Sequence, residues 1–204
     1  YQMKKSITFI LVLALFSCNT SIDNVTITQV ESNYPIIIGL DSSKDSIEYI
    51  VFPLTFLISQ SSFWEIHVDR CSCDYYYNSK YTRNGDWRGG VELWAKDNNN
   101  NLVLPTRENS LQDITRKEHE FVSYVYYGNL TKEAQALIHE QIKSIHIEAN
   151  KDTIHWKSIQ ELKQTSSQFI KTFLQKDSIR FGFYFYGRYT KWKIAHKKLP
   201  VEVK

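Results

Sequence analysis

The sequence is poor in glycine and proline and has almost no excess of charge. Seven Gly and four Pro among 204 residues exclude collagen-like and linker-like chains. The formal charge of +3 comes from 25 basic and 22 acidic side chains, and setting aside Lys4 and Lys5 of the N-terminal segment lowers the basic count by two, to 23. A chain this balanced lacks the positive excess that nucleic-acid binding needs, so no nucleic-acid partner is predicted.

Recognisable catalytic motifs are also missing. The sequence has no nucleophile elbow, no phosphate-binding glycine loop and no HExxH helix. No catalytic residue and no cofactor is therefore predicted. A site assembled from residues far apart in the chain would leave no such signature, and an envelope hydrolase with a nonlocal site stays open as an alternative.

The composition is that of a globular domain rich in aromatic residues. Hydrophobic residues make up 42% and charged residues 23% of the chain, with thirteen Tyr, eleven Phe and five Trp. These proportions argue against wholesale disorder, and the length is sufficient to bury a core.

The N-terminal segment has the order of a bacterial export signal. Tyr1 and Gln2 precede Met3, which we take as the true start. Lys4 and Lys5 are followed by a stretch at 7–16 that is apolar except for one threonine. Such a stretch is too short for a membrane-spanning helix, which needs about twenty apolar residues. It therefore predicts a removable signal rather than a permanent anchor.

The end of this segment, Leu15-Phe16-Ser17-Cys18, resembles the lipobox of bacterial lipoproteins. The resemblance implies that lipid is attached to the Cys18 thiol and that the signal is cut off before it. Asn19 stands where an Asp would signal retention in the inner membrane, so the resemblance implies the outer membrane of a Gram-negative cell. The predicted organisation is a signal at 1–17, a lipidated tether at 18–24 and one globular domain at 25–204.

The remaining chain predicts an α+β fold that is rich in strands. Thr131 is expected to cap a helix bearing Ala134, Leu137, Ile138 and Ile142 on one face, and Ser158 with Glu161 forms a capping-box pattern before a second helix. The overall prediction is an antiparallel β-sandwich-like body with two helices in the C-terminal half. The expected strands are 25–28, 34–40, 47–59, 63–77, 91–96, 102–104 and 119–127, a hairpin of 145–149 with 154–156, and 179–186 with 189–196. Pro53 in the third of these strands predicts a bulge or an edge position.

One short cluster combines histidine and cysteine. His67, Cys71 and Cys73 would share one face of a strand, together with Asp69. Imidazole and thiolate ligands suit Zn or Cu(I), which makes metal handling one alternative function. Export favours a Cys71–Cys73 disulfide, although on a regular strand their Cα atoms would be about 6.6 Å apart and the bridge would need a bulge. Two thiols in a half-buried strand are the third interpretation.

Aromatic side chains provide a second candidate site. Trp87 lies in a glycine-flanked loop, and Tyr184 and Tyr186 alternate with phenylalanines on a strand beside Arg180 and Arg188. These residues are predicted to bind a glycan or a protein by stacking, and the alternative is that they are ordinary strand and core residues. The runs Tyr75–Tyr77 and Tyr124–Tyr127 add further tyrosines with the same two interpretations.

A short pattern occurs three times, at Asp45-Ser46-Ile47, Asp152-Thr153-Ile154 and Asp177-Ser178-Ile179. It is similar to the acceptor motif of a general O-glycosylation system for exported bacterial proteins. The alternative is turn chemistry, because each pattern follows a lysine and begins a strand.

Taken together, these features predict a lipid-anchored cell-envelope protein with a binding or structural role. Its expected partners are the membrane, through the lipid on Cys18, and an envelope protein or a glycan.

Overall fold

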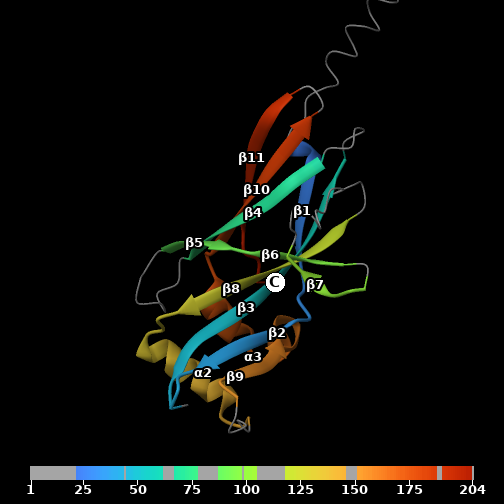
Figure 1. Ribbon diagram of the computed structural model, residues 1–204. Coiled ribbons are helices and arrows are strands. Elements are labelled where there is room, and N and C mark those ends of the chain that lie inside the picture. The colour runs from blue at the N-terminus through green and yellow to red at the C-terminus, as the bar shows by residue number, and fades with distance from the viewer. Residues whose placement is uncertain are drawn as a thin grey trace, which may run out of the picture.

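The computed structural model describes residues 22–43, 45–61, 67–77, 87–97, 99–104, 118–145, 151–187 and 190–203. Within these ranges, residue 22 and residues 67–72, 87–89, 184–187 and 190–194 are described by their backbone alone. Two antiparallel sheets and two helices form the described part (Figure 1), which confirms the predicted β-rich α+β fold.

The larger sheet, sheet A, has seven strands and is curled into a half-barrel. Its order is β7-β6-β8-β3-β2-β9, and β1 pairs with β3. A 3-10 turn, η1 (Ile22–Asn24), precedes β1. The strands are β1 (Val25–Val30), β2 (Pro35–Leu40), β3 (Ile47–Gln60), β6 (Leu93–Lys96), β7 (Leu102–Val103), β8 (His119–Gly128) and β9 (Thr153–Ser158).

The smaller sheet, sheet B, has four strands in the order β11-β10-β4-β5. The chain passes from sheet B to sheet A at Glu92, between β5 and β6. The prediction of one strand over 91–96 is therefore wrong, since it joined the ends of two strands in different sheets. The strands are β4 (His67–Tyr77), β5 (Trp87–Val91), β10 (Ser178–Gly187) and β11 (Thr190–Pro200).

Pro53 lies at the middle of β3, the most extensively paired strand. On one side it pairs with Tyr124 of β8. On the other side β1 pairs with residues 55–60 and β2 with residues 47–51, so Pro53 faces the gap between these two strands. Proline has no N–H to donate to a neighbouring strand. At Pro53, β3 is therefore paired on one side only, as at a sheet edge, although the rest of β3 lies in the middle of sheet A.

The two helices, α2 (Lys132–Ile142) and α3 (Ile159–Leu174), follow the predicted caps. The Thr131 side chain accepts a hydrogen bond at the start of α2, and Ser158 and Glu161 form the capping box of α3. Ile145, the first residue of the hairpin expected between 145–149 and 154–156, lies in a bend after α2, and 146–149 lie outside the described residues, so this hairpin stays a prediction. Leu137 was also misplaced, since it is exposed on α2.

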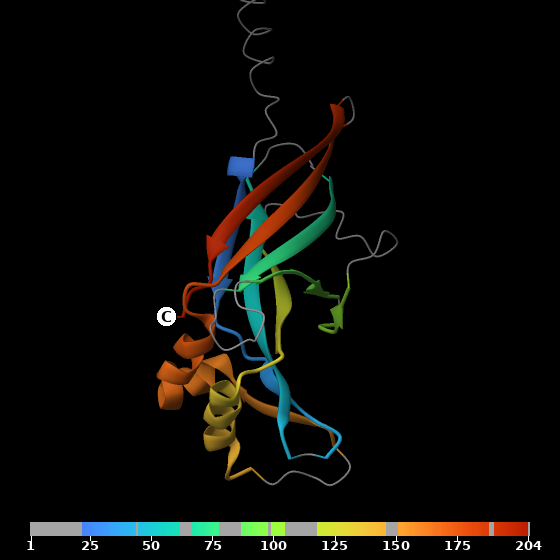
Figure 2. The same ribbon diagram turned by 90° about the vertical axis from the view of Figure 1, so that its left-hand side faces the viewer.

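The core lies between the two sheets at one end and between sheet A and the helices at the other (Figure 2). Phe56 of β3 contacts Phe181 of β10 edge to face, with ring centroids 5.0 Å apart. Phe52, four residues earlier on the same face of β3, contacts Phe173 of α3 at 5.5 Å. One face of a single long strand thus holds sheet B at one end and α3 at the other.

Candidate functional site

For most of the predicted site residues, the structure does not describe the side chain. Cys18 and Arg188 lie outside the described residues. The backbone positions of five others are known, but their side chains are not described: His67 and Cys71 on β4, Trp87 on β5, and Tyr184 and Tyr186 on β10. The binding and metal-ligating roles predicted for these side chains stay predictions.

Cys73 is buried on β4. Cys71 pairs with Phe183 and Cys73 with Phe181, so β4 is regular between the two cysteines. The irregularity in this pairing lies one step further along, between Cys71 and Val68. Among the residues whose side chains are described, no group of three His, Cys, Asp or Glu could hold a metal ion. Because the Cys71 and His67 side chains fall outside that set, the disulfide and the metal site remain untested.

Arg180, a predicted ligand-binding residue, is engaged by its neighbours on sheet B. Its guanidinium forms an ion pair with Asp74 on the adjacent strand β4. This hydrogen bond raises the pKa of Arg180 above its ordinary value. Tyr76 lies under two cations, with Arg180 5.9 Å and the Lys198 ammonium 3.9 Å from its ring centroid. Any ligand at Arg180 would therefore compete with Asp74.

Three of the tyrosines considered for a surface lie in the core. Tyr75, Tyr77 and Tyr127 are buried where the two sheets meet α3. The Tyr75 hydroxyl donates to the Asp177 carboxylate at 2.9 Å, and the Tyr127 hydroxyl donates to the same oxygen. Asp177 is only 1% exposed. Tyr75 and Tyr127 thus stabilise a buried carboxylate, and none of the three forms an exposed stacking surface.

Burial controls the ionisation of this cluster. It raises the pKa of Tyr75 well above the ordinary 10.0, and the nearby Asp177 charge raises it further. Burial is also the main cause of the raised pKa of Tyr127, followed by Tyr75 and Asp177. The Tyr77 pKa is raised by burial and then by Asp177. All three phenols therefore stay protonated at ordinary pH.

The face of sheet A turned away from the helices and from sheet B, here called the outer face, holds the other aromatic side chains. It is defined by the alternate residues of β3 and β8 that do not enter the core. Thr55 and Val122, at its middle, are nonetheless 3% and 0% exposed. The Thr55 hydroxyl is buried and makes no hydrogen bond with the described part of the chain. The exposed parts of this face therefore lie toward its ends.

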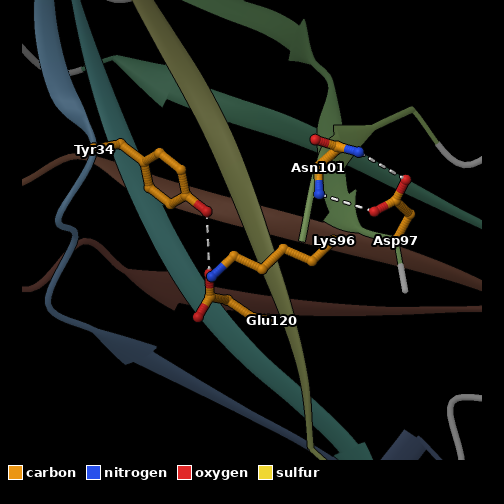
Figure 3. Close-up of polar contacts among 5 residues, drawn as sticks. All are labelled: Tyr34, Lys96, Asp97, Asn101 and Glu120. Atoms are coloured by element: carbon orange, nitrogen blue, oxygen red, sulfur yellow. Dashed lines mark hydrogen bonds and ion pairs between the residues drawn. The ribbon is translucent and has the colours of Figure 1, made fainter. Parts of the chain in front are cut away.

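A polar cluster occupies one end of the outer face (Figure 3). Tyr34, from the connection between β1 and β2, reaches across β3 and donates to the Glu120 carboxylate of β8 at 3.3 Å. The Lys96 ammonium of β6 lies 2.7 Å from the same carboxylate oxygen. The hydrogen bond with Glu120 is the first cause of the raised Lys96 pKa. Asp97 and Asn101 form the neighbouring turn by hydrogen-bonding to each other.

Two tyrosines occupy the other end. The rings of Tyr49 on β3 and Tyr126 on β8 are 4.9 Å apart and tilted by 35°. Tyr126 is 46% exposed, the largest exposure among the described large hydrophobic residues. We call these two residues the tyrosine pair.

Glycines lie beneath both rings of the tyrosine pair. A Cβ atom added to Gly39 would be 2.1 Å from the Tyr49 ring, and one added to Gly128 would be 2.5 Å from the Tyr126 ring. The rings therefore lie flat on the strands, in space that any other residue would fill. Partial burial and the Glu48 charge raise the Tyr126 pKa, which keeps its hydroxyl protonated and able to donate a hydrogen bond. Tyr126 belongs to a run noted in the sequence, whereas Tyr49 was missed.

Comparisons with family models, curated proteins and solved structures found no match to this chain. None of the helices in the described ranges combines the length and apolar character needed to cross a membrane.

Proposed function

We propose that this is a lipid-anchored cell-envelope protein that acts by binding a glycan at the tyrosine pair. The observation that carries the binding proposal is the exposed Tyr126 ring, packed against Tyr49 and lying over Gly128. Amphipathic rings of this kind offer a large contact area and lose little conformational freedom on binding, since only two side-chain torsions are fixed.

The surroundings of the pair favour a polar ligand with apolar faces, such as a sugar. Glu48 is exposed on β3, the strand next to Tyr126, and its charge raises the Tyr126 pKa. His155, also exposed, lies further across sheet A, on β9. A sugar ring can stack its C–H face on a tyrosine and place its hydroxyls against a carboxylate such as that of Glu48. No other exposed large aromatic side chain is described, which makes this pair the first place to test.

The position of the pair suits a protein attached by its N-terminus. Along β3, Tyr49 lies about 35 Å from Gln60, whose partner Val25 begins β1. A domain held through Cys18 would thus present the tyrosine pair at the end away from its tether.

Glycan binding is tested by substitution within the pair. We expect Tyr126→Ala to abolish or weaken binding at least ten-fold on an array of cell-envelope glycans, because one stacked ring is removed. Leu137→Ala on α2 is the matched control, since it also shortens an exposed hydrophobic side chain. Unchanged binding by Tyr126→Ala, in a variant with a wild-type melting temperature, would contradict the site.

The anchor is tested separately, on protein from membranes of a bacterial host. Mass spectrometry of its N-terminus should show Cys18 as the first residue, carrying diacylglycerol, and Cys18→Ser should abolish incorporation of labelled palmitate. An unmodified N-terminus that retains residues 3–17 would contradict the anchor without bearing on the glycan site.

A further inference from the structure

A β-bulge at Glu48 interrupts β3 beside the tyrosine pair. Alternation along a regular strand puts core residues an even number of positions apart, yet Ile47 and Ile50, three apart, are both buried in the core. The register explains this spacing, because the pairing of β3 with β2 skips one residue between Ile47 and Tyr49. Glu48 and Tyr49 are therefore both directed away from the core, on the side of the outer face.

The Glu48 carboxylate is available to a ligand. Its side chain is exposed, and it forms no ion pair with the residues whose side chains the structure describes. Glu120, at the other end of the outer face, is by contrast already paired with Lys96 at 2.7 Å. Partial burial and then the Glu48 charge raise the pKa of Tyr126, so the carboxylate lies within electrostatic range of that hydroxyl. The tyrosine pair thus has a negative charge at its edge.

Aromatic faces beside a carboxylate favour a cationic ligand. The π electrons of a tyrosine ring attract a protonated amine, and a neighbouring carboxylate adds a charge-assisted hydrogen bond. The rings of the tyrosine pair are tilted by only 35° to each other and lie over Gly39 and Gly128. They form a platform and not a cage that surrounds a single ammonium group. Such a platform fits a sugar ring that lies flat and carries its amine at the rim.

We infer that the glycan bound at the tyrosine pair carries free amino groups, and that Glu48 recognises their positive charge. This inference rests on the proposed glycan site and narrows its ligand to an amino sugar without N-acetyl groups. Acetylation of an amine removes its charge. A sugar with the same backbone and acetylated amines should therefore still stack on the rings but lose the attraction to Glu48.

Two oligosaccharides with one backbone test the inference. The probes are a short chain of β-linked glucosamine and its fully N-acetylated counterpart, each titrated calorimetrically into the full-length protein at mildly acidic pH. We expect the free-amine chain to bind about five-fold more tightly at low salt, and high salt should reduce the difference by screening the charges. Glu48→Gln should remove the difference and leave the affinity for the acetylated chain unchanged. Glu118→Gln, at another exposed carboxylate, is the matched control and should retain the difference.

The outcomes separate this inference from the glycan site itself. Equal affinity for the two chains, or an amine preference that survives Glu48→Gln, would overturn the inference and leave the site in place. Binding of neither chain, while other glycans bind and depend on Tyr126, would have the same meaning. Binding of a lysine oligomer without binding of the free-amine chain would overturn the inference in favour of a cationic peptide. If Tyr126→Ala leaves the affinity for both chains unchanged, the glycan site is wrong and the inference fails with it.

Discussion

The Tyr127 hydroxyl of β8 donates a hydrogen bond to the buried Asp177 carboxylate, which lies between α3 and β10. Tyr75 of β4 donates to the same oxygen, so one carboxylate links sheet A, sheet B and the end of α3. The Asp177 main chain extends this junction, because its carbonyl accepts a hydrogen bond from Val201 N–H after the last strand.

Removing one of these phenolic hydroxyls is expected to destabilise the protein. Tyr127→Phe leaves Asp177 with one tyrosine donor fewer in a site without access to water, which should lower the free energy of unfolding by about 1–3 kcal/mol. Tyr124→Phe is the matched control on the same strand, with a half-buried ring on the outer face and an expected change below about 0.5 kcal/mol. Urea denaturation measures both, and equal midpoints for the two variants would contradict the proposed role of Asp177.

The same cluster predicts a loss of stability in alkali. The folded-state pKa values of Tyr75 and Tyr127 lie well above the ordinary 10.0. Below pH 10 these phenols are neutral in both states and stability is unaffected. Above pH 10 only the unfolded chain releases the protons, so each phenol should cost about 1.4 kcal/mol of stability per pH unit.

Absorbance at 295 nm and circular dichroism measure this effect together. Exposed tyrosines should ionise first, and the remaining absorbance change should coincide with unfolding. Tyr75→Phe and Tyr127→Phe should each make stability fall less steeply with pH above 10. A buried-tyrosine signal that titrates while the fold persists would contradict the prediction.

Local structure was predictable from the sequence where both partners lie close in the chain. Ser158 and Glu161 are three residues apart, and their capping box forms as expected. The phenylalanines that alternate with the tyrosines of β10 also follow the sequence pattern, since Phe181 and Phe183 are buried in the core. Strand pairing was less predictable, because alternation reports which face a residue occupies and not which strand it meets. For this reason 91–96 was predicted as one strand, although Glu92 separates two sheets.

The candidate site depends on strand pairing, which the alternation of residues in the sequence does not reveal. Tyr49 and Tyr126 are brought together only by the register of β3 with β8. Gly39 and Gly128 were the available signal, because an isolated glycine within a strand often marks a close approach by another group. Asp177 was read as turn chemistry or part of an acceptor motif, and nothing nearby in the sequence indicates the two tyrosines that make its burial possible.

The capping box of α3 gives a third prediction. Ser158 accepts the Glu161 N–H at 3.2 Å, and the Glu161 carboxylate accepts the Ser158 N–H at 2.7 Å. Ser158→Ala should reduce stability by about 1 kcal/mol. Gln164→Ala, at an exposed position inside α3, should leave stability unchanged or slightly raised, because alanine is the better helix former. Thermal denaturation compares the two, and a neutral Ser158→Ala would contradict the cap.

The same cap responds to acid. Hydrogen bonds from Ser158 are the main cause of the lowered Glu161 pKa. Its contribution to stability is therefore fully present above the ordinary carboxyl pKa of 4.5 and is lost as pH falls through the lower folded-state value. Glu161→Gln should flatten the pH dependence of the melting temperature below pH 4.5, and an unchanged acid profile would contradict this linkage.

The three Asp-Ser/Thr-Ile patterns differ in the accessibility of their first residue, which gives a final prediction. Asp45 and Asp152 are exposed and precede β3 and β9 respectively. Asp177 is buried and bound by two tyrosines. A modifying enzyme acting on the folded protein could reach the first two patterns but could not read the third. Glycopeptide mass spectrometry of protein from a host with such a system should find Ser178 unmodified, with any glycan confined to Ser46 or Thr153. A glycan on Ser178 would mean that modification precedes folding, because the buried carboxylate must then have been accessible to the enzyme.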